Sequence, residues 1–317
     1  MSRPFSARVA DPAWQHEVTA WLGAELVDVE IRSIEQPRIR PWSTQLRIDS
    51  SDGVLWFKAN CAAQSFEPRL QSVLAALAPD SFDAPIAVDA ARGWMVTADR
   101  GQTWGERTEP GLDQWCELVV EAAQIQQRVI THGPHLAEAG VPDCSPGTVL
   151  ARFDRFVALM SGLPEEHPSH VAATTADDLR EHRADLEEAV RTLERSALPA
   201  TWQHGDLHPW NVFVVDGRPR LFDLGDAQWA HALEMLCVPF GWITERTDVP
   251  WEPVFSAYAA AWDLQAADLL DDWRAAGLTQ AVNRTLTWWS CLDEATAEEW
   301  AEWGDAPRYH LLRVLKQ

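Results

Sequence analysis

The sequence predicts an α+β fold in two lobes, with an N-terminal antiparallel sheet of five strands plus one helix and a mostly helical C-terminal part. Five short segments before residue 99 are apolar or alternate between apolar and polar residues, which is typical of strands. From Pro110 onward the apolar residues recur with the period of a helix. A chain of 317 residues is also long enough to bury two cores. We therefore place residues 1–99 in the N-terminal lobe and residues 100–317 in the C-terminal lobe.

The N-terminal lobe begins with a predicted helix over residues 11–24, in which Asp11 is the N-cap and Pro12 takes the first helical position. Another helix is predicted over residues 65–77. The predicted strands are 26–32, 45–49, 54–59, 86–88 and 94–97, and a Ser51-Asp52-Gly53 turn joins the second to the third. The polar residues 98–101 would then form the hinge between the lobes.

The C-terminal lobe is predicted to be helical on both sides of a hairpin. The predicted helices are 112–131, 146–163, 175–196, 231–245, 251–262, 266–276, 278–289 and 295–303. The hairpin consists of strands 211–215 and 220–224, because Asp216-Gly217 between two apolar runs is a strong turn signal. Folding back at this turn brings Asn211 and Asp223 close together. Two oxygen ligands, with Asp206 five residues before the first, suit Mg²⁺ on a polyphosphate.

The spacing of these three residues resembles the catalytic and metal loops of protein kinases. The segment HGDLHPWN, residues 204–211, is similar to the motif of the aminoglycoside phosphotransferase and choline kinase family of small-molecule kinases. The local resemblance covers roughly residues 200–226, and a weaker one extends back to about residue 30. It implies a bilobal protein-kinase-like fold and an ATP-dependent phosphotransferase that uses ATP or GTP with Mg²⁺.

The resemblance also implies roles for single residues. Asp206 would accept or orient the proton of the acceptor hydroxyl, while Asn211 and Asp223 would hold Mg²⁺. Three neighbours would support the loop rather than react, namely His204, His208 and Asp226. The family often has Gly-Asp-Pro soon after the metal loop, where this chain has His231 and Glu234 nearby as candidate buried polar groups.

Lys58 is the candidate phosphate-binding residue of the N-terminal lobe. The chain has only two lysines, Lys58 and Lys316, against 24 arginines, and a lysine offers a compact charge that arginine does not replace geometrically. Glu67, nine residues later in a predicted helix, would pair with Lys58 as in kinases. The alternative for Glu67 is a first-turn acid favoured by the helix dipole.

The first hairpin loop, which covers the nucleotide phosphates in kinases, contains no glycine here. Any phosphate contact would therefore come from backbone N–H groups or hydroxyls around Ser43 and Thr44.

Two other classes of protein stay open at this point. His204, Asp206 and His208 alternate three possible zinc ligands, which would suit a metal hydrolase. A binding protein without catalysis on the same fold is the other alternative. Against the hydrolase stands the upstream lysine, and against the silent protein stands the full set of kinase-type residues.

Composition bounds the partners and the compartment. A net charge of −22 argues against nucleic acid, since a nucleic-acid-binding protein needs a basic face. No apolar run is long enough to span a membrane and none follows the first residues. The five cysteines are scattered and odd in number, which fits a reducing compartment, so we expect a cytoplasmic protein. We expect a monomer or a homodimer.

The acceptor is expected to be a hydroxyl of a small molecule bound against the C-terminal helices. Residues 231–317 hold 14 acidic and six basic residues, a net charge of −8. That charge allows a cationic acceptor such as an aminoglycoside-like antibiotic or an amino sugar. A macrolide, a sugar or an amino alcohol is the alternative. Most of the 18 tryptophans are expected in the core.

Overall fold

A five-stranded antiparallel sheet forms the N-terminal lobe, as predicted, although its first strand covers residues 31–39 instead of 26–32. The computed structural model describes residues 3–316. The strands β1 (Ile31–Ile39), β2 (Ser43–Ser50), β3 (Gly53–Asn60), β4 (Ala87–Asp89) and β5 (Trp94–Ala98) lie in the order β1-β2-β3-β5-β4. In the central strand β3, Lys58 pairs with Gln45 on one side and Met95 on the other. The register therefore places Lys58 in the middle of the sheet.

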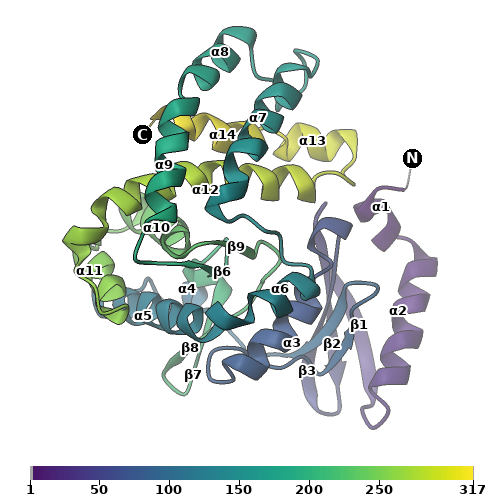
Figure 1. Cartoon of the computed structure of the whole chain (residues 1–317). Coiled ribbons are helices and arrows are strands. Elements are labelled where there is room, and N and C mark those ends of the chain that lie inside the picture. Colours follow the sequence, from purple (N-terminus) through teal and green to yellow (C-terminus); the bar gives the residue numbers. More distant parts are fainter. Residues whose placement is uncertain (1–2, 317) are drawn as a thin grey trace.

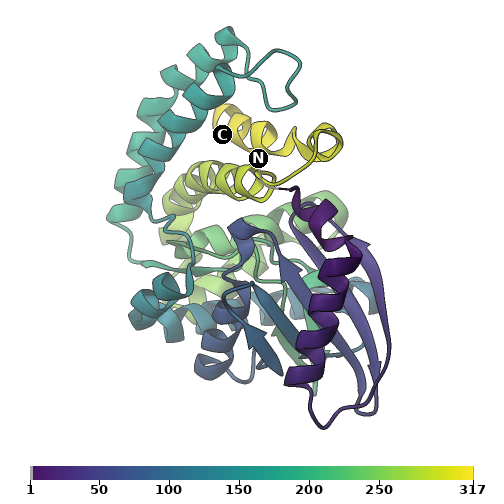
Figure 2. The ribbon, with the colours of Figure 1, turned by 90° about the vertical axis from the view of Figure 1, so that its right-hand side faces the viewer.

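Helix α2 (Pro12–Glu25), which follows the short α1 (Phe5–Val9), covers the outer face of the sheet (Figure 2). Asp11 caps α2 as predicted, and its carboxylate accepts a hydrogen bond of 2.8 Å from the backbone N–H of Ala13. Trp21 of α2 packs edge-on against two aromatic rings of the sheet, a favoured geometry. Its ring centroid lies 5.8 Å from Phe57 and 5.6 Å from Trp94.

The helix on the other side of the sheet is α3 (Glu67–Leu77), which lies toward the helical lobe (Figure 1). It starts two residues later than predicted because Ala62–Gln64 forms a separate 3-10 turn before it. Pro68 occupies the first turn of α3, where a proline needs no N–H partner. Glu67 is consequently the first helical residue, and it faces Lys58.

Helices make up most of the C-terminal lobe (Figure 1). They are α4 (Trp104–Arg107), α5 (Leu112–Val129), α6 (Gly133–Ala139), α7 (Pro146–Ser161), α8 (Ala173–Glu181), α9 (Arg183–Glu194), α10 (Cys237–Arg246), α11 (Trp251–Ala261), α12 (Leu270–Cys291), α13 (Ala297–Trp303) and α14 (Ala306–Leu312). None of the described helices is long and apolar enough to cross a membrane.

Several predicted helices differ from the structure; in the predicted helix 231–245, for example, residues 231–236 are the end of a strand and a 3-10 turn, and α10 begins only at Cys237. The segment 175–196 is two helices, because His182, with ψ of 0°, ends α8 and redirects the chain. The break lets Leu179 of α8 and Leu186 of α9 enter the same core cluster. The predicted helices 266–276 and 278–289 instead merge into α12 after a 3-10 turn. Gly277 lies inside α12, where glycine costs only about 1 kcal/mol relative to alanine.

The predicted hairpin is formed by β7 (Val212–Val215) and β8 (Arg218–Leu221). Its turn uses positive φ at Asp216 (51°) and Gly217 (78°), as the sequence predicts. The second strand was expected to reach residue 224 but ends at Leu221, because Asp223 has a φ of 62° that breaks the strand. A second small sheet pairs β6 (Ala200–Gln203) with β9 (Gln228–His231).

Helix α12 connects the cores of the two lobes. Its middle residues Ala281 and Val282 are buried among the helices of the C-terminal lobe. Its last residue Cys291 and the following Leu292 are buried with the sheet and α2. The segment after α12 returns to the N-terminus, where the backbone N–H of Phe5 donates to Glu294 O at 3.1 Å. The end of the C-terminal part thus contributes to the core of the N-terminal lobe.

Candidate active site

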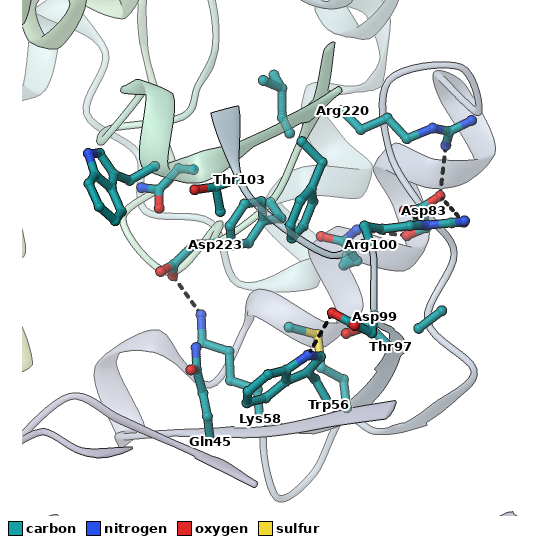
Figure 3. A pocket seen from close by; sticks show the side chains of 18 of the residues that line it. Gln45, Trp56, Lys58, Asp83, Thr97, Asp99, Arg100, Thr103, Arg220 and Asp223 are labelled. Atoms are coloured by element: carbon teal, nitrogen blue, oxygen red, sulfur yellow. Dashed lines mark hydrogen bonds and ion pairs between the residues drawn. The ribbon is translucent and has the colours of Figure 1, made fainter. Parts of the chain in front are cut away.

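A cleft of about 510 Å³ lies between the sheet and the helical lobe (Figure 3). The sheet contributes Lys58 and Met95, and the hinge contributes Ala98 to Gly101. The opposite wall is formed by the loop 204–211 and by the loop 222–226 after β8, which we call the metal-type loop. The cleft therefore collects residues from both lobes, and Lys58 points across it toward Asp223 (Figure 3).

Lys58 joins the two walls of the cleft by ion pairs. Its Nζ lies 2.7 Å from Glu67 Oε2 and 2.6 Å from Asp223 Oδ1. Glu67 is fully buried and also accepts hydrogen bonds from Asn60 Nδ2 (2.6 Å) and the backbone N–H of Leu224 (2.8 Å). Burial lowers the pKa of Lys58, but Asp223 and Glu67 outweigh burial and the pKa is raised. Lys58 is consequently charged.

The loop 204–211 is held by its own histidines. His204 Nε2 donates to the carbonyl oxygen of Phe222 (3.0 Å), and its Nδ1 accepts from the backbone N–H of Asp206 (3.4 Å). Burial lowers the pKa of His204 to about 4. Both ring nitrogens of His204 are thus occupied by backbone groups, which leaves none for a zinc ion and argues against the hydrolase alternative.

Gly205 explains why the loop can pass so close to the metal-type loop. It has a φ of +81°, and a Cβ at this position would lie 2.0 Å from the backbone oxygen of Asp226. Only glycine combines this conformation with this approach.

Each carboxylate oxygen of Asp206 has its own donor. Arg284 Nη2 lies 3.1 Å from Oδ1, and His208 Nε2 lies 3.2 Å from Oδ2. His208 Nδ1 accepts from the backbone N–H of Trp210, so the proton is on Nε2. Burial raises the pKa of Asp206, but Arg284 and His208 together hold it well below its usual range. Asp206 is therefore an ionised, oriented carboxylate.

Asn211 and Asp223 line the same cleft, both at the open end of the hairpin, just before β7 and just after β8. Asn211 Nδ2 donates to the backbone oxygen of Asp206 at 2.9 Å, which leaves its carbonyl Oδ1 as the atom for a cation. Asp223 Oδ1 is paired with Lys58. Burial raises the pKa of Asp223, but Lys58 and Arg38 outweigh it and the pKa is lowered. An amide oxygen and an ionised carboxylate are a donor set that fits Mg²⁺.

Ser43 and Thr44, expected to contact phosphate, lie elsewhere. Both side chains are buried and neither lines the cleft. Thr44 Oγ1 donates to the backbone oxygen of Arg38 (2.9 Å) and accepts from Gln36 Nε2 (2.9 Å). The structure does not place their hydroxyls in the cleft. The side chain of Thr44 lies on the face of β2 opposite to Gln45, which lines the cleft, and Ser43 is buried at the start of the strand.

Sequence reasoning missed Arg38. It lines the cleft and lowers the pKa of Asp223, and its buried Nε has no hydrogen-bond partner among the described residues. Arginine is so frequent in this chain that no sequence signal distinguished this one.

Asp226 lies behind the cleft rather than in it. It accepts hydrogen bonds from Gln64 Nε2 (2.7 Å) and Arg284 Nη1 (2.5 Å). Burial raises the pKa of Asp226 although Arg284 lowers it. Arg284 was also missed, although it is the only charged residue between Arg274 and Asp293.

A second cavity of about 90 Å³ shares Trp42, Asp206 and Asp223 with the main cleft. Its other wall is formed by α12 through Arg284, Thr287, Trp288 and Cys291. A small molecule in this cavity would lie beside Asp206, on the side away from the hinge.

His231 and Glu234, which stand near the family's usual Gly-Asp-Pro segment, are both buried. Glu234 accepts hydrogen bonds from Thr279 Oγ1 (2.7 Å) and Asn283 Nδ2 (2.9 Å). Burial raises the pKa of Glu234 to about 7. Glu234 thus connects the chain after β9 to α12, whereas His231 Nδ1 accepts from the backbone N–H of Leu233.

Comparison with known proteins points to one family. The model of the phosphotransferase enzyme family matches residues 73–270. No curated protein matches the sequence at a significant level.

Solved structures with the same fold cover nearly the whole chain. The GDP and kanamycin complex of APH(2″)-IIia has a TM-score of 0.60 at 13% identity, covering 94% of this chain and 99% of that one. Choline kinase LicA from Streptococcus pneumoniae has a TM-score of 0.62 at 13% identity, covering 96% and 99%. Macrolide 2′-phosphotransferase MphH from Brachybacterium faecium has a TM-score of 0.59 at 15% identity, covering 93% and 98%. The bilobal, protein-kinase-like fold predicted from the sequence is thereby confirmed.

Proposed function

The chain belongs to the phosphotransferase enzyme family, and on this premise we propose that it moves the γ-phosphate of Mg·ATP to a hydroxyl group of a small molecule. The proposal rests chiefly on the ion pair of 2.6 Å between Lys58 and Asp223, which brings a cation of one lobe to a carboxylate of the other. Phosphoryl transfer requires mainly positioning and charge neutralisation, and both are features of this cleft.

The nucleotide would bind along the cleft with its base toward the hinge. The backbone of residues 98–101 would take the base edge, next to the apolar side chains of Met95 and Phe222. Lys58 would contact the α- and β-phosphates, held in place by Glu67. Backbone recognition does not distinguish adenine from guanine, so GTP is the alternative donor.

The phosphates lack a glycine-rich cover, and Arg38 is the side chain placed to replace it. Its guanidinium lines the cleft beside Asp223 and has an Nε without a protein partner. Asn211 and Asp223 would hold Mg²⁺, which neutralises phosphate charge when bound.

The reacting end of the acceptor would enter the second cavity, with its hydroxyl against Asp206, while the rest of the molecule would lie outside this cavity of about 90 Å³. The hydroxyl oxygen attacks the γ-phosphorus, the bond to the β–γ bridging oxygen breaks, and the nucleoside diphosphate leaves with that electron pair. Asp206 orients the acceptor hydroxyl and passes the proton of that hydroxyl to water. Arg284 and His208 hold the carboxylate ionised, so Asp206 does not keep the proton.

For the acceptor class, we propose an aminoglycoside-like molecule or a related amino sugar. The three carboxylates of Asp206, Asp223 and Asp226 around one arginine favour a cationic or neutral acceptor over an anion. Among proteins with this fold, one is a kanamycin complex, one a choline kinase and one a macrolide phosphotransferase. A macrolide, a sugar and an amino alcohol are therefore the alternatives to be assayed.

The test is nucleotide turnover with Mg·ATP and a panel of these acceptors, comparing the wild type with Asp206→Ala. Loss of this carboxylate should lower kcat by about 10²–10⁴-fold. The KM for ATP should change little, because Lys58 and Arg38 are untouched. A matched control is Asp216→Ala in the hairpin turn, which should keep wild-type turnover. Unchanged turnover in Asp206→Ala contradicts the assignment, and Mg·ATP binding without product for any acceptor favours a binding protein.

A further inference from the structure

Arg284 holds two carboxylates of the candidate active site at once. Its Nη2 lies 3.1 Å from Asp206 Oδ1, and its Nη1 lies 2.5 Å from Asp226 Oδ2. The side chain of Arg284 is only 8% exposed, whereas those of Asp206 and Asp226 are partly exposed, so the ion pairs are partly shielded from solvent. A planar guanidinium can bridge two carboxylates in this way, which a lysine ammonium does not reproduce geometrically.

The contact with Arg284 determines which way the carboxylate of Asp206 faces. His208 takes Oδ2 and Arg284 takes Oδ1, and the two donors come from different parts of the chain. The ring of His208 is itself fixed, since it stacks on Trp242 with centroids 5.0 Å apart. Asn211 Nδ2 adds a longer contact of 3.4 Å to Oδ2, so that Arg284 is the only side-chain donor to Oδ1 among the described residues.

The backbone that carries Arg284 is rigid. Next to it in α12, the backbone oxygen of Asn283 accepts from Gln228 Nε2 at 3.0 Å, and Thr287 Oγ1 accepts from the same amide at 2.7 Å. One turn further on, Cys291 is buried with the sheet of the other lobe. Packing against both lobes therefore fixes the position of Arg284, and Arg284 in turn fixes the carboxylate of Asp206.

The second cavity lies on the side of Asp206 where Arg284 stands. Trp42, Thr287 and Trp288 form its walls with Arg284. Removing the guanidinium would leave Asp206 and Asp226 as two neighbouring carboxylates without a shared cation, and like charges repel. The carboxylate of Asp206 would then turn away from Asp226 and from the position that an acceptor hydroxyl needs.

We propose that Arg284 is a positioning residue, which acts through Asp206 to aim its carboxylate at the acceptor hydroxyl, and that it does not bind the nucleotide. This inference rests on the proposed function for its kinetic consequence, but its structural part does not. Arg284 does not line the nucleotide cleft, whereas Asp206 lines both cavities. The effect of losing Arg284 should consequently be seen in kcat and not in nucleotide binding.

The experiment compares the wild type with Arg284→Met and Arg284→Lys, using Mg·ATP with water as the acceptor. Arg284→Met should lower kcat for hydrolysis by about 10²-fold, the effect of a displacement of about 1 Å at a reacting group. The KM for ATP should stay within about twofold of the wild type. Arg284→Lys should recover part of kcat, because one ammonium can still hold one of the two carboxylates.

Arg152→Met is the matched control for a merely structural role. Arg152 also braces α12, through a hydrogen bond of 2.6 Å from its Nη1 to Asn283 Oδ1, but it touches neither Asp206 nor Asp226. It should lower thermal stability and leave kcat per folded molecule unchanged. A raised KM for ATP, or a loss in Arg284→Met no larger than in Arg152→Met, would overturn the inference.

A crystal structure of Arg284→Met tests, independently of turnover, whether Arg284 positions the carboxylate of Asp206. The carboxylate of Asp206 should be rotated away from its wild-type position, and an unmoved carboxylate would contradict the inference. If the wild type neither binds nor hydrolyses Mg·ATP, the proposed function fails, while the position of Asp206 in the variant still tests Arg284.

Discussion

Lys58 is the residue on which the charge balance of the cleft depends. Its stem is buried and its Nζ is shared by two carboxylates, one of which, on Glu67, has no exposure to solvent. Removing one member of a buried ion pair leaves the other as an uncompensated charge, which costs about 3–5 kcal/mol. The two residues are therefore coupled in stability as well as in any role with phosphate.

The substitution Lys58→Met should lower the free energy of unfolding by about 3–5 kcal/mol, because Glu67 would remain buried without its cation. The double variant Lys58→Met with Glu67→Gln should recover a large part of that loss. Urea unfolding of the two single variants, the double variant and the wild type measures the coupling. Equal stability of the single Lys58 variant and the double variant would contradict it.

At the same scale, single residues show what sequence reasoning can and cannot predict. Lys58, Asp206, Asn211 and Asp223 converge in one cleft, as the resemblance of their motifs to those of kinases implies. Arg284 belongs to a helix nearly 80 residues downstream of Asp206, and no local pattern reports which helix face meets which loop. Long-range packing decides such contacts, so they become visible only in the fold.

At the scale of the element, the hairpin and the loop before it illustrate how local conformation restricts the sequence. Two glycines with positive φ stand there in different surroundings. A Cβ on Gly205 (φ +81°) would meet the backbone of Asp226 at 2.0 Å, whereas one on Gly217 (φ +78°) would meet nothing within 4 Å. Comparing the two glycines therefore separates the free-energy cost of a left-handed backbone conformation from that of the close contact with Asp226.

Gly217→Ala should cost about 1–2 kcal/mol, the penalty of a left-handed conformation alone. Gly205→Ala should cost clearly more than that, because the backbone of the metal-type loop must also move. Thermal unfolding of both variants gives the comparison, and turnover should fall only in Gly205→Ala. Two equal losses of stability would show that the contact with Asp226 adds nothing.

Element boundaries were predicted less well than element types. The strand after the turn ends at Leu221 instead of residue 224, because Asp223 leaves the strand conformation to reach Lys58. The merger of two predicted helices into α12 has a similar cause, since packing on both sides outweighs the cost of Gly277. In both cases tertiary contacts overrode the local signal.

At the scale of the whole molecule, the cleft predicts how ligand binding should affect stability. The residues proposed to hold Mg·ATP come from both lobes, so the ligand should bind the folded chain and not the unfolded one. Such a ligand stabilises a protein by about 2.7 kcal/mol at a concentration of 100 times its Kd.

We therefore expect Mg·ATP to raise the melting temperature. ATP with EDTA should raise it less, because the triphosphate then adds its full charge to the carboxylates of the cleft. The variant Asp223→Ala should lose the difference between the two conditions, since it lacks one proposed ligand of the cation. Differential scanning fluorimetry measures all of these, and equal shifts with and without Mg²⁺ would contradict the proposed metal site.

The course of the chain at its end has a consequence for recombination among relatives. Cys291 and Leu292 are buried against the sheet, and Phe5 is hydrogen-bonded to Glu294. In a chimera that exchanged only residues 1–99, the segment after α12 would have to pack against the sheet of a different protein. Productive crossovers should accordingly occur in pairs, one at the hinge and one within α12, so that sheet and tail are inherited together.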